Sequence, residues 1–173
     1  MTLQEIFDYT NNVLLDGELD ELSNIIDFLD EAQQMIARID MVPATPVEYE
    51  LTTNAITLPA DFLRLYKATL EEEPYTFTDE PWAGELTLPT GVTEGTLKIW
   101  YFKIPTALSV LTPTQVPEVN PVYHRMMADY AAKMYYLIDD DAAMRDAFAA
   151  EFRGKIASFK TPPVVSSGRF KNY

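Results

Sequence analysis

The chain has 173 residues, 47% of them hydrophobic, and this is enough apolar material to fill the core of one domain of ordinary size. It has no cysteine, which excludes disulfides and thiolate metal sites. Because His124 is its only histidine, a histidine-rich metal site is also excluded. The formal net charge of −14 disfavours a nucleic-acid clamp, because phosphate binding needs Lys and Arg in excess. Residues 1–15 lack the pattern of a secretory signal and no window is apolar enough to span a membrane, so we expect no membrane attachment.

Two helices are predicted in the first 40 residues. Thr2 and Glu5 have the spacing of a capping box, which predicts a helix that begins at Thr2 and is broken by Asp16-Gly17. From Glu18 to about Asp40, apolar residues recur every three or four positions, which predicts a second, longer helix. Pro43 then ends it, because proline lacks the N–H that a helix interior requires.

A central β-region is predicted over residues 46–105. Apolar and polar residues alternate there with a period close to two, and prolines mark the corners between the runs. The runs indicate an antiparallel β-insert of four or five strands, with residues 47–51, 56–58, 62–70, 85–88 and 96–104 as the candidates.

The last third of the chain returns to helices. Residues 106–119 are predicted as an extended connection, and Asn120-Pro121 then supplies an N-cap followed by proline at the first helical position. The acids of residues 139–141 favour the start of a last helix, which ends near Lys160. We therefore expect an α+β fold: a helical bundle formed by N- and C-terminal helices (2–40 and 120–160), a central antiparallel β-insert, and an extended C-terminal arm, residues 161–173.

No arrangement typical of catalysis is present. The six glycines form no phosphate-binding loop, and residues 139–141 lack the ligand spacing of a calcium loop. The chain has 27 acids, and their spacing selects no pair for acid–base work; Glu71-Glu72-Glu73 is predicted as a solvated loop tip. His124 is predicted as a lone surface or interface histidine. We therefore expect no catalytic residue, no cofactor and no metal.

The helix over residues 123–138 is apolar on more than one side. Methionines and tyrosines cover more of it than one core stripe requires, so it is either buried on two sides or meets another chain. We favour the second reading, with Tyr135 and Tyr136 as candidates for a subunit interface. Trp82, between Pro81 and Gly84 in a predicted loop, is a third candidate.

Charge is distributed unevenly along the chain. Residues 1–40 hold ten acids and one base, a balance of −9, whereas residues 153–173 hold five bases and no acid, a balance of +5. Opposite charges at the two ends of one chain can steer and orient neighbouring copies during association.

The order of these segments resembles that of a tailed-phage head-to-tail connector, the neck adaptor that docks beneath the portal ring. The resemblance rests on the acidic N-terminal helices and the β-insert with Leu58-Pro59-Ala60-Asp61-Phe62 and Ile99-Trp100-Tyr101-Phe102-Lys103-Ile104-Pro105. It continues through Pro117-Glu118-Val119-Asn120-Pro121 into Tyr123-His124, then Tyr130-Ala131-Ala132 and the Asp-rich corner before the final helix, and covers residues 1–160.

The resemblance implies a structural protein of the virion and not an enzyme. Such adaptors form a ring, most often of twelve subunits, that extends the portal channel at the head–tail interface, after assembly in the host cytoplasm. The expected partners are other copies of the chain, the portal protein, and a tail or further neck protein; DNA is only passing cargo. The C-terminal segment of such adaptors reaches along the portal or a neighbouring subunit, so Arg169, Phe170, Lys171 and Tyr173 are expected to bind an acidic partner.

Two other classes of function stay open at this point. The first is a phage assembly chaperone or an acidic DNA-mimic binding protein, which would form small oligomers outside the virion. The second is an enzyme, which would require a deep pocket lined by two or more carboxylates.

Overall fold

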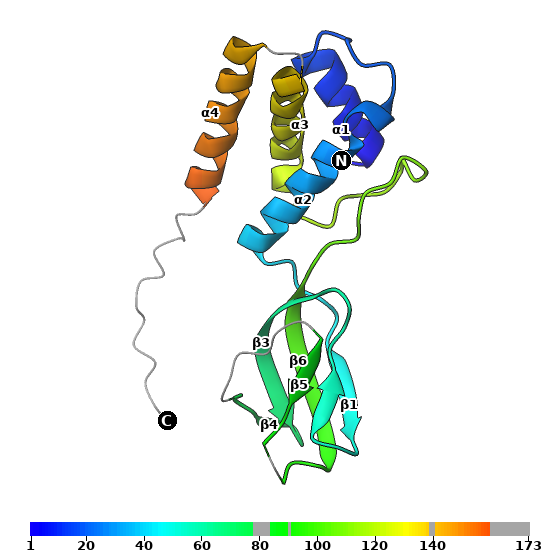
Figure 1. Cartoon of the computed structure of the whole chain (residues 1–173), viewed down its shortest axis with the longest axis vertical. Coiled ribbons are helices and arrows are strands. Elements are labelled where there is room, and N and C mark those ends of the chain that lie inside the picture. The colour runs from blue at the N-terminus through cyan, green and yellow to red at the C-terminus, as the bar shows by residue number, and fades with distance from the viewer. Residues whose placement is uncertain (78–83, 90, 139–140, 160–173) are drawn as a thin grey trace.

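The helices gather at one end of the molecule and the strands at the other (Figure 1). The structure, a computed structural model, describes residues 1–77, 84–89, 91–138 and 141–159. Helices come from both ends of the chain and antiparallel strands lie between them in sequence, so the predicted α+β class is confirmed.

The first helix begins where the sequence predicts. α1 spans Leu3–Tyr9, and its capping box is formed: the Glu5 amide donates to Thr2 Oγ1 at 3.2 Å, and the Thr2 amide donates to Glu5 Oε2 at 2.8 Å. The chain continues as one π-helical turn over Thr10–Leu14. Asp16 and Gly17 follow with φ of 50° and 82°, a left-handed backbone that ends the helix as expected.

The second helix is shorter than predicted. α2 spans Ile26–Asp40, so the prediction that it begins at Glu18 is wrong. The Asn11 side chain forms two hydrogen bonds of 2.9 Å with the backbone of Leu19, which holds this segment outside a helix. Reciprocal bonds between Glu21 and Asn24 then close a 3-10 turn over Leu22–Asn24.

The last two helices pack side by side. A 3-10 turn over Pro121–Tyr123 is capped by Asn120, whose Oδ1 accepts from the Val122 amide at 3.1 Å, and it leads into α3, His124–Ile138. α4 spans Ala142–Phe159, and Asp141 Oδ1 accepts from its first amides at 3.0 and 3.1 Å. Both caps stand where the sequence predicts a helix start.

The helices enclose a core of their own. The first half of α3 lies at its centre, in contact with α1, α2 and α4 (Figure 1). The helix therefore has neighbours on more than one side within its own chain. The fully buried members of this helical core include Leu3, Ile6, Leu15, Ile25, Leu29, Ala32, Met127, Ala128, Ala131 and Ala132.

The strands form two small sheets. A four-stranded antiparallel sheet has the order β1-β6-β3-β4, with β1 Val47–Leu51, β6 Gly95–Lys103, β3 Phe62–Leu70 and β4 Glu73–Pro74. A two-stranded sheet pairs β2, Ala55–Thr57, with β5, Glu85–Thr87. These strands lie within the predicted insert, and only the two-residue β4 was not expected. The sheet core comprises Leu51, Ile56, Leu58, Phe62, Ala68, Leu86, Leu88, Leu97, Ile99 and Tyr101.

Two adjacent segments join the helices to the sheets. The amide of Lys103 donates to the Val42 carbonyl at 2.8 Å, and the amide of Ala44 donates to the Tyr101 carbonyl at 2.9 Å. The chain thus enters and leaves the β-insert at the same place, and none of the described residues belongs to both cores.

Candidate interaction surfaces

Most residues predicted for partner binding lie outside the described part of the chain: Trp82, Arg169, Phe170, Lys171 and Tyr173. Tyr135 and Tyr136 are described, and both are half-buried against the helical core. The ring of Tyr136 stacks on Phe148 of α4 with centroids 5.9 Å apart, and burial raises the pKa of Tyr136. A role for the two tyrosines between subunits stays a prediction.

His124 is a buried residue, so the prediction of a surface or interface histidine is wrong. Its side chain is 0% exposed at the start of α3. The Met1 amino group lies 2.9 Å from Nδ1, and Nε2 lies 3.3 Å from the Val119 carbonyl. Burial and the positive amino group lower the pKa of His124, which favours a neutral ring that accepts at Nδ1 and donates at Nε2. This arrangement fastens the chain start to α3.

An ion pair joins α3 to α4. The Asp129 carboxylate is 2% exposed and accepts from Lys155 Nζ, which also pairs with Glu151 at 2.9 Å. Burial raises the pKa of Asp129, against the opposing effect of the lysine. A carboxylate in this position must have its cation, since an unpaired charge in the interior is costly. The need to neutralise this buried carboxylate therefore explains the ion pair as a structural contact between α3 and α4.

The outer face of the four-stranded sheet carries aromatic and basic side chains. Along β6, buried residues alternate with half-exposed Lys98, Trp100 and Phe102, which point away from the core. The Trp100 ring lies under two ammonium groups, 4.3 Å from Lys67 Nζ and 5.5 Å from Lys98 Nζ, so it is not the core anchor that its residue type suggests. Tyr66, 49% exposed, stacks on Phe102.

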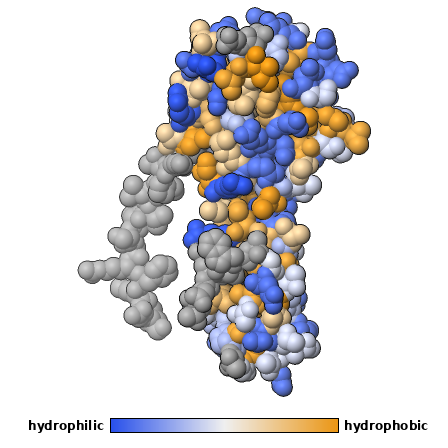
Figure 2. Space-filling model, viewed as in Figure 1, coloured by the Kyte–Doolittle hydropathy of each residue, from blue (hydrophilic) through white to orange (hydrophobic). Residues whose placement is uncertain are grey.

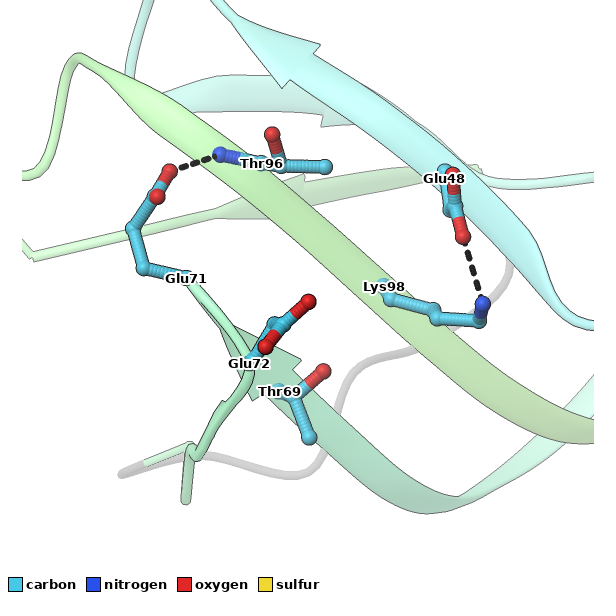
Figure 3. Close-up of a pocket in the computed structure, with 6 residues that line it drawn as sticks. All are labelled: Glu48, Thr69, Glu71, Glu72, Thr96 and Lys98. Carbon is cyan, nitrogen blue, oxygen red and sulfur yellow. Dashed lines mark hydrogen bonds and ion pairs between the residues drawn. The ribbon is translucent and has the colours of Figure 1, made fainter.

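An open hollow of about 390 Å³ lies at one end of this face (Figure 3). Its lining residues are Glu48, Thr69, Glu71, Glu72, Thr96 and Lys98. Glu71 Oε1 accepts from the Thr96 amide at 2.5 Å, and Glu48 pairs with Lys98. Glu71 and Glu72 have φ of 50° and 68° and form the tight turn between β3 and β4.

The three glutamates of the hollow are all exposed. Two of the three are also engaged by neighbouring donors. The prediction of a solvated loop tip at residues 71–73 is confirmed in its exposure: Glu71 and Glu72 form the turn, and exposed Glu73 begins β4.

A loop between the sheet and α3 projects apolar side chains into solvent. It runs along α1 and α2 and turns back at Ser109–Gln115, the segment that extends furthest from the bundle (Figure 1). Leu111 is 89% exposed and Val110 41% exposed at its tip, where Figure 2 shows a hydrophobic cluster. The sequence does contain a signal for this exposed tip, because Val110 and Leu111 are apolar but fit neither a helical nor a strand period. The sequence analysis nevertheless predicts residues 106–119 only as a connection.

A shallow apolar groove lies between three helices. It is lined by Ile36 and Ile39 of α2, Tyr123 of the 3-10 turn, Met126 of α3 and Ile156 of α4. Ile39 is 37% exposed, and the Tyr123 hydroxyl is held by Asp40 at 3.0 Å. Each of these residues fits the apolar pattern of its own helical segment, so the sequence predicts its apolar character. The gap between the three helices is not predicted by any of these patterns.

The described residues contain neither a cluster of metal-ligating side chains nor a helix that is apolar and long enough to cross a membrane. The SU10 adaptor protein family model matches residues 1–168, and the chain belongs to this family. It is thus a structural adaptor protein of a bacteriophage, a virion component whose partners are portal or tail proteins. No curated protein matches the chain.

Proposed function

We propose that this chain is the subunit of a homo-oligomeric ring of twelve copies, the size most common among head-to-tail connectors, and that this ring docks beneath the portal. The ring extends the DNA channel and joins the capsid to the tail. Membership of a phage adaptor family supports a mechanical and adhesive role, in which the protein binds copies of itself and a neighbouring ring.

The observation that carries the proposal is the separation of charge along the chain. Residues 1–40 have a balance of −9 and residues 153–173 one of +5. The acids that stand exposed around α1 and α2 are Glu5, Asp8, Asp16, Glu18, Asp20, Glu21, Asp27 and Glu31. An acidic surface and a basic terminal segment on one subunit favour head-to-tail association with a fixed polarity.

The same acidity suits a channel for passing DNA. A surface rich in carboxylates repels phosphates, so a DNA molecule in transit is not retained. In this proposal the basic terminal segment contacts protein, and Arg169, Phe170, Lys171 and Tyr173 fasten the ring to the portal or to the next subunit.

The test measures mass and portal binding. Native mass measurement of the full chain, alone and mixed with portal, is expected to give a closed ring in at least one condition. Deletion of Thr161–Tyr173, or alanine at the four basic and aromatic positions, is expected to abolish portal binding, whereas Ser166→Ala/Ser167→Ala retains it. Undiminished binding after deletion would discard the arm hypothesis. A monomer in both conditions, or absence of the protein from purified particles, would discard the ring and favour an assembly chaperone.

A further inference from the structure

We infer that the apolar loop tip of one subunit, Val110 and Leu111, docks on the outer face of the four-stranded sheet in the next subunit. The inference rests on the proposed ring and identifies one contact between its subunits. In the loop, Leu111 is 89% exposed and Val110 41% exposed. The acceptor, which we call the aromatic end of the sheet face, consists of Arg64, Tyr66 and Lys67 of β3 with Trp100 and Phe102 of β6.

A β-bulge turns one aromatic ring of this acceptor toward solvent. Leu65 pairs with Tyr101 and Lys67 pairs with Trp100, so Tyr66 is an extra residue of β3 opposite two consecutive residues of β6. A bulge of this kind bends its strand and redirects the side chain of the extra residue. The Tyr66 side chain is 49% exposed. The sheet therefore presents an aromatic surface that the described part of its own chain leaves partly uncovered.

Three aromatic rings and two cations share this surface. Tyr66 stacks on Phe102 with ring centroids 4.6 Å apart, and Trp100 lies on the same face two residues before Phe102. Lys67 and Arg64 are the register partners of Trp100 and Phe102 on β3. An apolar side chain can pack over such rings on an open face, so it needs no cavity. Aromatic residues and arginine are also enriched in the cores of protein interfaces.

The loop is braced in the conformation that presents Leu111. Gln115 ties its two ends together, since its side chain accepts from the Ser109 amide at 3.3 Å and donates to the Ala107 carbonyl at 3.2 Å. The Leu111 amide donates to Ser109 Oγ at 3.2 Å. A loop ordered before binding loses little conformational entropy on binding, so the burial of one leucine contributes more of its free energy to association.

The loop is also fastened to the helical bundle. The amide of Leu3 donates to the Gln115 carbonyl at 2.7 Å, and the amide of Gln4 donates to the Pro113 carbonyl at 2.9 Å. These are the first amides of α1, which have no partner within the helix. The loop tip is therefore held with the helices and not with the strands.

The loop tip and the sheet face lie on different parts of the molecule. Figure 1 shows the helices at one end and the strands at the other, with the loop beside α1 and α2. The tip of one subunit is thus placed to serve the sheet face of another copy. Two different surfaces that complement each other make a heterologous contact, which repeats around a ring when the rotation closes.

The acceptor lies on two basic strands of an acidic chain. The net charge of the chain is −14, but β3 and β6 contain no acid and hold four bases, Arg64, Lys67, Lys98 and Lys103. The glutamates on this side of the sheet line the hollow around Lys98, and neither Arg64 nor Lys67 belongs to that lining. The two cations of the aromatic end are therefore separate from those glutamates.

The surface around the loop tip is neutral or acidic. Residues 104–117 contain no charged residue, and residues 1–37, which include α1, contain no Lys or Arg. Asp30 accepts from the Leu108 amide at 2.9 Å, and Gln4, which binds the loop, donates to Asp8 at 2.9 Å. Acids beside the tip and bases beside the rings favour a second copy as the occupant of the sheet face and orient it on approach.

The absence of cysteine allows a direct test by cross-linking. Leu111→Cys and Tyr66→Cys are prepared as separate proteins of different mass, assembled together with or without portal, and oxidised. The expected product is a covalent heterodimer that disappears on reduction. Leu111→Cys mixed with Thr57→Cys, an exposed position in the two-stranded sheet, is the matched control and should give at most background heterodimer. Equal cross-linking of the two pairs overturns the inference.

The sign of a charge at the loop tip provides the second test. Leu111→Lys is expected to weaken self-association by about tenfold or more per contact, because it removes a buried leucine and brings a further cation to Arg64 and Lys67. Leu111→Glu should weaken it less, since its carboxylate meets those two cations. Val122→Lys, at a position that is 53% exposed outside the loop, should assemble like the natural chain. If Leu111→Glu is impaired as strongly as Leu111→Lys, the tip does not meet a basic surface and the inference is wrong.

The outcomes separate this contact from the proposed ring. If the natural chain forms a ring and Leu111→Lys forms it equally well, the ring stands and the contact between loop tip and sheet face is wrong. If the natural chain is monomeric alone and with portal, both proposals are wrong. If oxidised Leu111→Cys is recovered joined to portal and not to Tyr66→Cys, the loop binds the portal and the inference is overturned. Since Leu111 is 89% exposed, circular dichroism should show its variants folded.

Discussion

His124 illustrates how one buried ring makes stability depend on pH. Both ring nitrogens have partners in the interior, the Met1 amino group and the Val119 carbonyl, and the ring itself has no exposed surface. Burial lowers the pKa of His124 below its ordinary value of 6.5. The folded chain therefore takes up a proton on this ring at lower pH than the unfolded chain does.

We predict that the buried imidazole of His124 destabilises the fold as pH falls. Above about pH 7 both states hold it neutral, so it adds no pH dependence. As pH decreases through 6.5 toward the lowered pKa, the unfolded chain binds the extra proton and the free energy of unfolding falls by up to about 1.4 kcal/mol per pH unit. Urea unfolding of the natural chain and of His124→Gln at pH 7.5, 6.5 and 5.5 measures this. The stability difference between the two proteins should shrink toward pH 5.5; a constant difference contradicts the prediction.

A second prediction at the residue scale concerns the Asp129–Lys155 ion pair and the removal of one of its partners. Lys155→Met leaves the nearly inaccessible Asp129 carboxylate without its main cation, and should cost about 2 to 4 kcal/mol in the free energy of unfolding. Asp129→Asn/Lys155→Met should recover part of that loss, because the buried group is then neutral. Glu151→Gln, which changes only the exposed partner, should cost less than about 0.5 kcal/mol. If Lys155→Met is as mild as Glu151→Gln, the carboxylate does not depend on this lysine.

At the scale of elements, one glutamine ties both ends of the connection between the sheet and α3 to α2. Gln33 is fully buried on α2; its Nε2 donates to the Thr106 carbonyl at 2.9 Å and its Oε1 accepts from the Glu118 amide at 3.0 Å. It thereby fixes both ends of the segment that carries the loop tip. Glu118 also pairs with Lys103 at 2.8 Å. Burial raises the pKa of the Glu118 carboxyl group, but the hydrogen bond from Lys103 helps to lower it, and the net shift is downward.

Gln33→Leu should therefore loosen this connection. Two backbone groups lose their partner, at about 1 to 3 kcal/mol for each one that stays buried and unsatisfied. Gln34→Leu is the matched control, since half-buried Gln34 makes one bond, to the Pro105 carbonyl at 3.1 Å, and should cost less. Amide hydrogen exchange at Glu118 should become faster in Gln33→Leu and stay slow in Gln34→Leu. Unchanged exchange in both would show that the connection is held by other contacts.

Elements with a local signal could be predicted from the sequence, and elements set by distant contacts could not. The Thr2–Glu5 capping box, the Asn120 cap and the alternation of β6 are local patterns, and all three appear in the structure. The segment before Ile26 is apolar at helical spacing, but Asn11 binds the backbone of Leu19 from eight residues away and holds it in a loop. Sequence periodicity contains no trace of such a bond.

The candidate surfaces follow the same division. The tyrosines of α3 are prominent in the sequence, and the contact of Tyr136 with Phe148 requires the packing of α4, which the sequence does not specify. The exposure of Leu111 depends on the hydrogen bonds of Gln115 that turn the chain back. The groove depends on three helices whose residues leave a gap, and no pattern within one helix indicates it.

At the scale of the whole molecule, the described part of the chain has two separate cores. The helical core and the sheet core share no residue, and the two connecting segments lie beside each other where Lys103 N donates to the Val42 carbonyl. Paired antiparallel residues lie about 5 Å apart between Cα atoms, so a short linker can replace everything between them. Each core can therefore be tested without the other.

We predict that the helical part folds alone. In a variant with Gly-Ser-Gly in place of residues 44–102, the buried residues of the helical core are all retained, so helical circular dichroism and one cooperative thermal transition should persist. As a control, Leu97→Ala in the full chain should destabilise the sheet core by about 2 to 5 kcal/mol while amides of α3 stay protected. Loss of the cooperative transition would show that the helices need the sheets.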